Sequence, residues 1–260
     1  MKKVLFIVMA LIIIIGIVGC TGKDENNLAK YVVNEEVNYN IEGYKTIYTQ
    51  NLKKVIDEEL ETIVINGGGD IDVEKSSNDK VVIEMSKIIQ DKDSTKGKLK
   101  IAAEKFEVKA NKKNEKLEID INPHVEKMGL NYGGARLDLK LYLPNGIKLK
   151  IDNDFGDITI REVEGIFDIN KHSGRVEFKG KMINSPNYFA TKFGTIEIWL
   201  ENGKGYNLKA SAGKFGEIKA GDDELFSPLS DGESLNTSIA GGGRKVKLKT
   251  TSGEIIVHKN

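Results

Sequence analysis

The sequence of 260 residues contains only one cysteine, Cys20. A single cysteine excludes disulfide bonds and cysteine-rich metal sites within one chain. A folded domain without cross-links must be stabilised by buried apolar surface, and roughly 240 residues beyond an export signal are enough for one sizeable core.

An excess of charge of either sign is also missing. Lysine and arginine together number 39, and so do aspartate and glutamate, which leaves a formal net charge of +0. A balanced surface predicts no electrostatic attraction to nucleic acid or to anionic lipid. We therefore expect no nucleic-acid partner.

The chain also lacks the patterns of long helices and of catalytic centres. No stretch after Pro123 has the periodicity of an amphipathic helix, and the three histidines, His124, His172 and His258, are scattered. No acid, base and metal-ligating residues converge in a recognisable motif. We expect no catalytic residues, no cofactor and no metal site.

What the chain does contain is a short repeated phrase: a glycine, a polar residue, Ile or Val, any residue, and an apolar residue. Its copies begin at Gly69, Gly156, Gly174, Gly194, Gly216 and Gly253. The intervals between the second and fifth copies are 18, 20 and 22 residues, and the last interval, 37, is close to two units. Such self-similarity indicates stacked units, each too small to bury its own apolar face. The glycine suits a tight turn with a positive φ.

These patterns predict an all-β fold, a β-solenoid or β-helix-like stack of short strands with coils of roughly 18–22 residues. We expect consecutive coils to be neighbours in the stack, with free strand edges only at its two ends. A less regular, strand-rich N-terminal part precedes the stack. In that part we expect strands at 60–65, 70–73 and 80–85, a short helix at 98–106, a hairpin of 106–110 with 116–121, and a strand at 137–143.

The N-terminus has the form of an export signal. Met1, Lys2 and Lys3 precede an apolar run at 4–18, which is short for a membrane-spanning helix. The sequence Ile17-Val18-Gly19-Cys20 resembles a bacterial lipobox, which implies cleavage before Cys20 and its acylation, for example with palmitate. An uncleaved membrane anchor is the alternative. We expect a signal peptide at 1–19, a lipid-anchored flexible tether at 20–44, and the β-strand-repeat solenoid at 45–260.

The repeat region also resembles a known family. The stretches at 141–146 and 148–160, together with the entry at 63–73 and 81–85, are similar to the bacterial "putative adhesin" domain with β-strand repeats. This resemblance implies a β-solenoid-like fold and exposure at the cell surface. It supplies no family-wide catalytic residues, and similar proteins are associated with cell-envelope stress responses.

The outward positions of the repeated strand give one candidate site. They hold Thr159, Glu177, Glu197 and Lys219, and two glutamates one coil apart would lie near the roughly 5 Å separation of a retaining glycosidase pair. The alternative is a solvated face on which Lys219 offsets the glutamates.

Two other groups of residues have alternative interpretations. Tyr142, Tyr188 and Trp199 lie on the polar phase of their strands, so they form either a binding patch or locally packed side chains, covered in the second case by the insertion at 221–243. Asp152, Asp154 and Asp157 have the spacing of calcium ligands but also of an ordinary turn, and we favour the turn.

Taken together, the sequence predicts a non-catalytic, lipid-anchored protein on the extracytoplasmic face of the cell membrane, with an adhesin-like binding domain. Its expected contacts are the membrane, through the anchor, and a wall polymer, host glycan or envelope protein. The alternative function is an accessory role in an envelope stress-signalling system that contacts membrane proteins.

Overall fold

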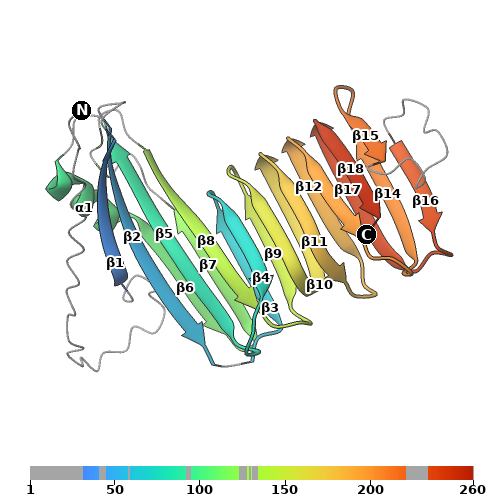
Figure 1. Ribbon diagram of the computed structural model, residues 1–260, viewed down its shortest axis with the longest axis horizontal. Helices are drawn as coiled ribbons and strands as arrows, with labels where there is room; N and C mark the ends of the chain where they lie inside the picture. The colour runs from blue at the N-terminus through green and yellow to red at the C-terminus, as the bar shows by residue number, and fades with distance from the viewer. Residues whose placement is uncertain are drawn as a thin grey trace, which may run out of the picture.

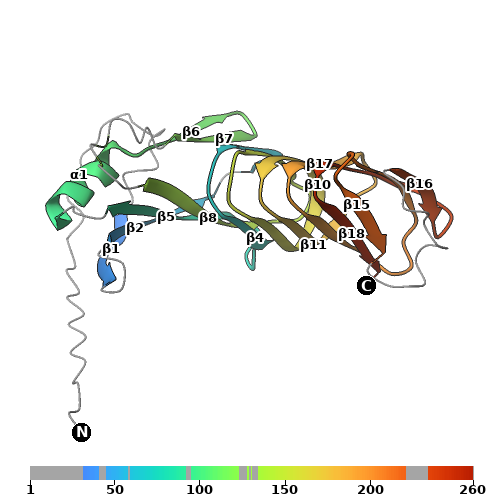
Figure 2. The same cartoon turned by 90° about the horizontal axis from the view of Figure 1, so that it is seen from above.

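The computed structural model describes residues 32–40, 45–57, 59–91, 95–122, 128, 130, 134–220 and 234–259. These residues form 18 strands and one helix, and the strands run side by side from β1 at one end to β16 at the other (Figure 1). The view from above shows two layers of strands (Figure 2). The all-β prediction is confirmed.

The two layers are two sheets that share one long strand, β10 (Ile158–Ser173). Sheet A contains, in spatial order, β1 (Val32–Asn40), β2 (Lys45–Ile56), β5 (Val81–Asp91), β8 (Gly134–Leu143), β4 (Ile71–Lys75), the first half of β10, β11 (Val176–Met182), β13 (Ile196–Leu200), β18 (Glu254–Lys259) and β15 (Glu217–Ala220). Sheet B contains β6 (Glu107–Lys113), β7 (Lys116–Asn122), β3 (Thr62–Gly67), β9 (Lys148–Asn153), the second half of β10, β12 (Asn187–Phe193), β17 (Arg244–Ser252), β14 (Tyr206–Ala212) and β16 (Ser234–Ile239).

The coil β3–β4 and every coil from β9 onward run from a strand of sheet B through a glycine turn to a strand of sheet A. The strands alternate buried and exposed side chains, as in β14, because one face of each sheet covers the shared core. Phe167, Phe178 and Phe189 meet in the middle of that core, with ring centroids 4.8 to 6.3 Å apart. The core therefore runs along the stack between the two sheets.

The coils do not stack in the order of the chain. The coil β17–β18 lies between β12–β13 and β14–β15, since β18 pairs with both β13 and β15. At the other end, β3–β4 lies between β7–β8 and β9–β10. The predicted coil length holds for the steps from Gly156 to Gly174 and Gly194, but the prediction that consecutive coils are always neighbours was wrong at both ends.

The glycines of the repeated phrase form a ladder at one corner of the stack. Gly156, Gly174, Gly194 and Gly253 all have a positive φ, between 93° and 144°. A Cβ atom on Gly174, Gly194 or Gly253 would overlap the carbonyl oxygen of the repeat glycine one coil before it. The glycine is therefore required twice, by its backbone conformation and by the close approach of the next coil.

The N-terminal part is a set of antiparallel strands with one helix. Strands β1, β2, β5 and β8 pair antiparallel, and β6 and β7 form the predicted hairpin. The predicted helix is α1 (Lys96–Lys105), whose N-cap Thr95 accepts a hydrogen bond from the backbone N–H of Lys98. Strand β1 lies within the segment expected to be a tether, so the sheet begins before residue 45. The rest of that segment, together with residues 1–19, Cys20 and His124, lies outside the described residues.

A row of buried polar side chains lies beneath the glycine ladder. Asn153, Lys171, Thr191 and Thr250 are register neighbours on β9, β10, β12 and β17, and each is at most 3% exposed. Asn153 donates to the carbonyl of Gly69 at 2.9 Å, whereas the Nζ of Lys171 has no hydrogen-bond partner. Burial lowers the pKa of Lys171 to about 8, and nearby Asp157 and Asp70 oppose this shift only in part. An unpaired buried amine of this kind destabilises the fold.

We expect Lys171→Met to raise the free energy of unfolding at pH 7 by about 1–3 kcal/mol. Methionine removes the buried, unpaired amine but fills a similar volume. In the native protein, Lys171 loses its proton near pH 8, whereas the unfolded chain holds that proton to about pH 10.4. The native chain should therefore gain stability as the pH rises from 8 to 10, by up to about 3 kcal/mol, and the variant should lack this gain. Urea denaturation of both proteins across this pH range measures the difference. Parallel pH profiles would contradict the assignment.

Candidate functional site

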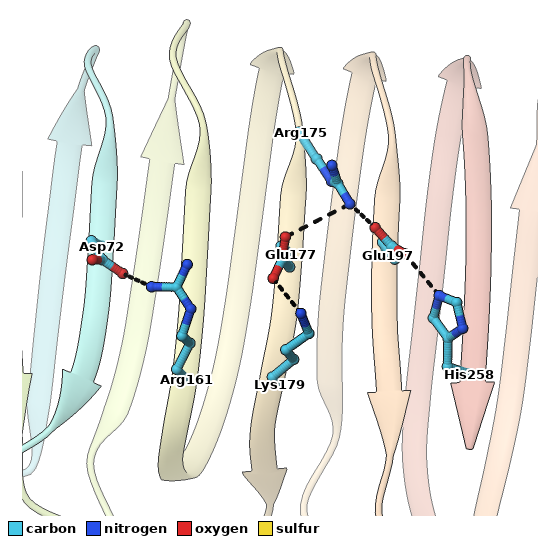
Figure 3. A network of polar contacts seen from close by, with 7 residues as sticks. All are labelled: Asp72, Arg161, Arg175, Glu177, Lys179, Glu197 and His258. Atoms are coloured by element: carbon cyan, nitrogen blue, oxygen red, sulfur yellow. Dashed lines mark hydrogen bonds and ion pairs between the residues drawn. The ribbon is translucent and has the colours of Figure 1, made fainter. Parts of the chain in front are cut away.

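A row of ion pairs covers the outer face of sheet A (Figure 3). Glu177 on β11 and Glu197 on β13 are register partners on adjacent strands. The guanidinium of Arg175 lies 3.7 Å from the carboxylate of Glu177 and also pairs with Glu197. The Nζ of Lys179 lies 2.8 Å from Glu177, and the Nε2 of His258 lies 2.8 Å from Glu197. Each glutamate thus has two nitrogen partners, from its own or a neighbouring coil.

The electrostatics of Glu197 do not suit acid catalysis. Its side chain is only 11% exposed, and burial alone would raise its pKa. Hydrogen bonds from His258 and Arg175 outweigh burial, so the pKa of Glu197 lies below its usual value. A retaining glycosidase needs one carboxyl group with a raised pKa to serve as the acid. The geometry therefore favours the solvated-face interpretation, with ion pairs that tie neighbouring coils together.

Lys219 has a different role from the one expected. The register places Ile256 of β18 between Glu197 and Lys219, so the prediction that Lys219 offsets the glutamates was wrong. Lys219 instead pairs with Glu217 at 2.9 Å and with Glu254 at 2.6 Å. Hydrogen bonds to Glu254 and Glu217 raise the pKa of the Lys219 amine. The insertion of β18 into the stack is the cause of the error.

The structure does not bring Tyr142, Tyr188 and Trp199 together. Tyr142 lies on β8 and Trp199 on β13 of sheet A, with β4, β10 and β11 between them. Tyr188 lies on β12 of sheet B, where the Nζ of Lys247 is 5.6 Å from its ring centroid. The three aromatic side chains therefore do not form one surface.

Trp199 is packed on both sides by its neighbours along the stack. The ring of His258, on β18, is stacked on it at 4.3 Å, and the Nζ of Lys179, on β11, lies 4.1 Å from its centroid. Strands β18 and β11 flank β13 on opposite sides. Stacking of a sugar on Trp199 would have to displace one of these groups, so the geometry favours local packing.

A shallow hollow of about 430 Å³ lies on sheet A where β4, β5, β8 and β10 meet. Ion pairs hold two of its carboxylates, Asp72 with Arg161 at 2.9 Å and Asp138 with Arg136 at 3.2 Å. Burial raises the pKa of Asp138, and Arg136 opposes that shift. Within the described ranges, no group of three or more His, Cys, Asp or Glu side chains is placed to hold a metal ion.

The aspartates of the repeated phrase bind backbone groups of the next coil. Asp70 accepts a hydrogen bond from the N–H of Asp157 at 2.8 Å, and Asp157 accepts one from the N–H of Arg175 at 2.8 Å. Asp152 accepts from the side chain of Asn170 at 3.2 Å. These contacts match the turn interpretation of this segment.

The residues that the sequence analysis missed lie on sheet B. Strands β12, β17, β14 and β16 are adjacent and contain no aspartate or glutamate. Five lysines on three of these strands are exposed, and we call them the lysine face: Lys192, Lys209, Lys245, Lys247 and Lys249. The other half of sheet B is mixed in charge, with ion pairs such as Lys150 with Asp168 at 3.4 Å.

The lysines of this face are not neutralised by neighbouring strands. Lys209 and Lys247 are direct register partners on β14 and β17, and like charges in that position are destabilising. Among the residues that the structure describes, none supplies a carboxylate within ion-pair distance of the lysine face. The alternation Lys245-Val-Lys-Leu-Lys249 could have revealed one row of this face, but the zero net charge of the whole chain concealed it.

No helix in the described part of the chain is both long and apolar enough to cross a membrane. The comparison with curated proteins finds no match. The family model of Toastrack DUF4097 matches residues 145–258, which include the coils from β10 to β18.

Solved structures of two bacterial proteins match most of this chain. One, a "putative cell adhesion protein" from Clostridium sporogenes, has a TM-score of 0.51 and 14% sequence identity, covering 80% of this chain and 99% of that one. Another, a "putative adhesin" from Bacteroides fragilis, has a TM-score of 0.30 and 9% identity, covering 81% and 97%. The first likeness shows a shared fold, and the second score is too low to support an argument. Residues 145–258 of this chain are therefore similar to Toastrack DUF4097 domains, and the chain has a β-solenoid-like fold.

Proposed function

We propose that this protein is a non-catalytic binding protein, lipid-anchored through Cys20 on the extracytoplasmic face of the cell membrane. The single observation that carries the binding role is the lysine face, a group of exposed charges on one sheet that no carboxylate among the described residues neutralises. Like charges placed side by side cost stability, so a partner that neutralises them would gain binding energy. The adhesion protein from Clostridium sporogenes, which shares the fold, is named for a role of the same kind.

A non-catalytic role is supported by the outer face of sheet A. Glu177 and Glu197 are held in ion pairs, and the lowered pKa of Glu197 does not suit an acid catalyst. Parallel coils that share one core form a stiff platform, which suits binding of an extended partner. We assign residues 1–19 to the signal peptide, the segment from Cys20 to the start of β1 to the tether, and the rest to the solenoid.

Cys20→Ala tests the anchor. We expect the variant either to be released from the membrane or to accumulate as an unprocessed precursor, because acylation and the cleavage that depends on it both need the thiol. Intact-mass measurement and membrane fractionation of the native protein and the variant give the result. A variant with unchanged mass and unchanged membrane retention would show that Cys20 is not lipidated.

Proximity labelling from the anchored protein tests the binding role, with an anchored unrelated domain as control. Enrichment of proteins that are linked to a surface polymer, or of proteins involved in adhesion, would support the proposal. Enrichment of membrane sensor proteins would favour the envelope-stress alternative. If nothing extracytoplasmic were enriched over the control, binding to a surface polymer, an adhesion partner or a membrane sensor protein would be refuted.

A further inference from the structure

A second feature adjoins the lysine face at the corner of the stack. Phe193 and Phe215 each precede a glycine of the repeated phrase, and they are 46% and 80% exposed. They belong to the coils β12–β13 and β14–β15, with one coil between them, so they lie roughly 10 Å apart. We call these two residues the phenylalanine corner.

Each phenylalanine of the corner has a lysine beside it. The Nζ of Lys192 lies 5.3 Å from the ring centroid of Phe193, and the Nζ of Lys214 lies 5.8 Å from that of Phe215. Lys192 is also a member of the lysine face, so the two features are continuous. The corner thus presents apolar rings edged by cations, next to a sheet surface with no acidic side chain.

This combination has a specific chemical complement. A soluble polyanion would pair with the lysines but would leave the rings in water. The interface of an anionic bilayer offers both phosphate groups for the lysines and acyl chains for exposed phenylalanine. Exposed apolar side chains that are grouped and rimmed by polar residues mark membrane or protein interaction sites.

We propose that the lysine face and the phenylalanine corner together dock on an anionic lipid bilayer. The proposal deepens the proposed function by naming the partner, but it does not depend on the lipid anchor. The lysines contact the phosphate headgroups, and Phe193 and Phe215 enter the interface at the corner. Strand β1 and this surface lie at opposite ends of the stack, so an anchored chain that docks in this way lies along the membrane (Figure 1).

The test uses residues 21–260, which contain every described strand and lack Cys20, so binding cannot come from the anchor. The protein is sedimented with vesicles of phosphatidylcholine alone or with 30% phosphatidylglycerol, at low and high salt. We expect the native chain to bind the anionic vesicles at least ~10-fold more tightly, and to lose this preference at high salt. Equal binding to both vesicle types, or binding to soluble polyphosphate but not to vesicles, would overturn the proposal.

Matched variants locate the contact. The triple change K209Q, K247Q and K249Q should weaken binding to anionic vesicles by at least ~10-fold, since each lysine near the surface contributes about fivefold. The control triple K98Q, K100Q and K105Q removes the same charge from α1, and should change binding by less than about twofold. Phe215→Ser should weaken binding several-fold, whereas Ile101→Ser, at a side chain 53% exposed on α1, should not.

Unchanged thermal unfolding of each variant, followed by circular dichroism, shows that the fold is retained. Equal effects of the two triple variants would refute docking through the lysine face. The segment at 221–233 carries five acidic residues and lies outside the described residues. The chain is compared with a variant in which these five residues are changed to Asn and Gln. If only that variant bound anionic vesicles, the acidic segment would be the partner of the lysine face, and the proposal would fail. Failure of this assay leaves the Cys20 and proximity-labelling tests unaffected.

Discussion

Gly194→Ala is expected to lower the free energy of unfolding by about 3–5 kcal/mol, a large part of the stability of an ordinary domain. Two costs combine at this position. The backbone φ of 144° lies in a region that residues with a side chain rarely adopt. An added methyl group would also overlap the carbonyl oxygen of Gly174 in the adjacent coil. Its three nearest atoms are all backbone atoms of Gly174, so no flexible side chain could move away.

The control for this prediction is Gly203→Ala. Gly203 also has a positive φ, 71°, but an added Cβ would have no atom within 4 Å. It should therefore cost only about 1 kcal/mol, the ordinary penalty of the left-handed region. Urea denaturation with fitted midpoint and slope measures both variants. If Gly194→Ala and Gly203→Ala lowered the free energy of unfolding equally, the close approach of neighbouring glycine turns would add nothing to the cost at Gly194.

The local structure of each coil could be predicted from the sequence because it depends on neighbouring residues. Alternation of apolar and polar residues identifies the strands, and the glycine before each repeated strand identifies the turn. The helix α1 and the hairpin of β6 and β7 could also be predicted from local patterns. The residues that indicate each of these elements lie within about ten residues of one another along the chain.

The order of the coils could not be predicted in this way. Every coil has the same alternation and the same glycine, so the local pattern fits any neighbour equally well. Contacts between particular side chains distinguish the observed order, such as His258 with Glu197 and Trp199 across β18 and β13. Those partners are far apart in the sequence, and nothing in either segment alone indicates the pairing.

The lysine face could not be predicted for a related reason. The phase of a strand shows which side chains point outward, but not which sheet or which coil they belong to. Tyr142, Tyr188 and Trp199 share a phase and yet lie apart on two sheets. Net charge is a sum over the chain, so it cannot show that the acidic residues avoid four adjacent strands. The lysine face becomes visible only when β12, β17 and β14 are placed side by side.

The insertion of β17–β18 into the stack leads to the second large expected effect. A chain that ends after Gly243 should lose the ordered structure of β14 and β15, because these strands would lose their parallel partners β17 and β18. The deletion removes four buried apolar side chains, Val246, Leu248, Ile255 and Val257, whose burial contributes about 6–12 kcal/mol. That amount is comparable with the whole stability of a domain.

Hydrogen exchange measured by mass spectrometry distinguishes the observed order from a sequential stack. In a sequential stack the last coil would be an end cap, and its removal would leave β14 paired with β12. In the observed order, the amides of β14 in the shortened chain should exchange within about tenfold of the unfolded rate, whereas those of β10 and β11 stay protected. A peptide of residues 244–260 added to the shortened chain should restore the protection of β14, since it supplies the missing coil. Protection of β14 without the peptide would mean that the last coil does not lie inside the stack, and a peptide without effect would mean that pairing with β17 does not hold β14 in place.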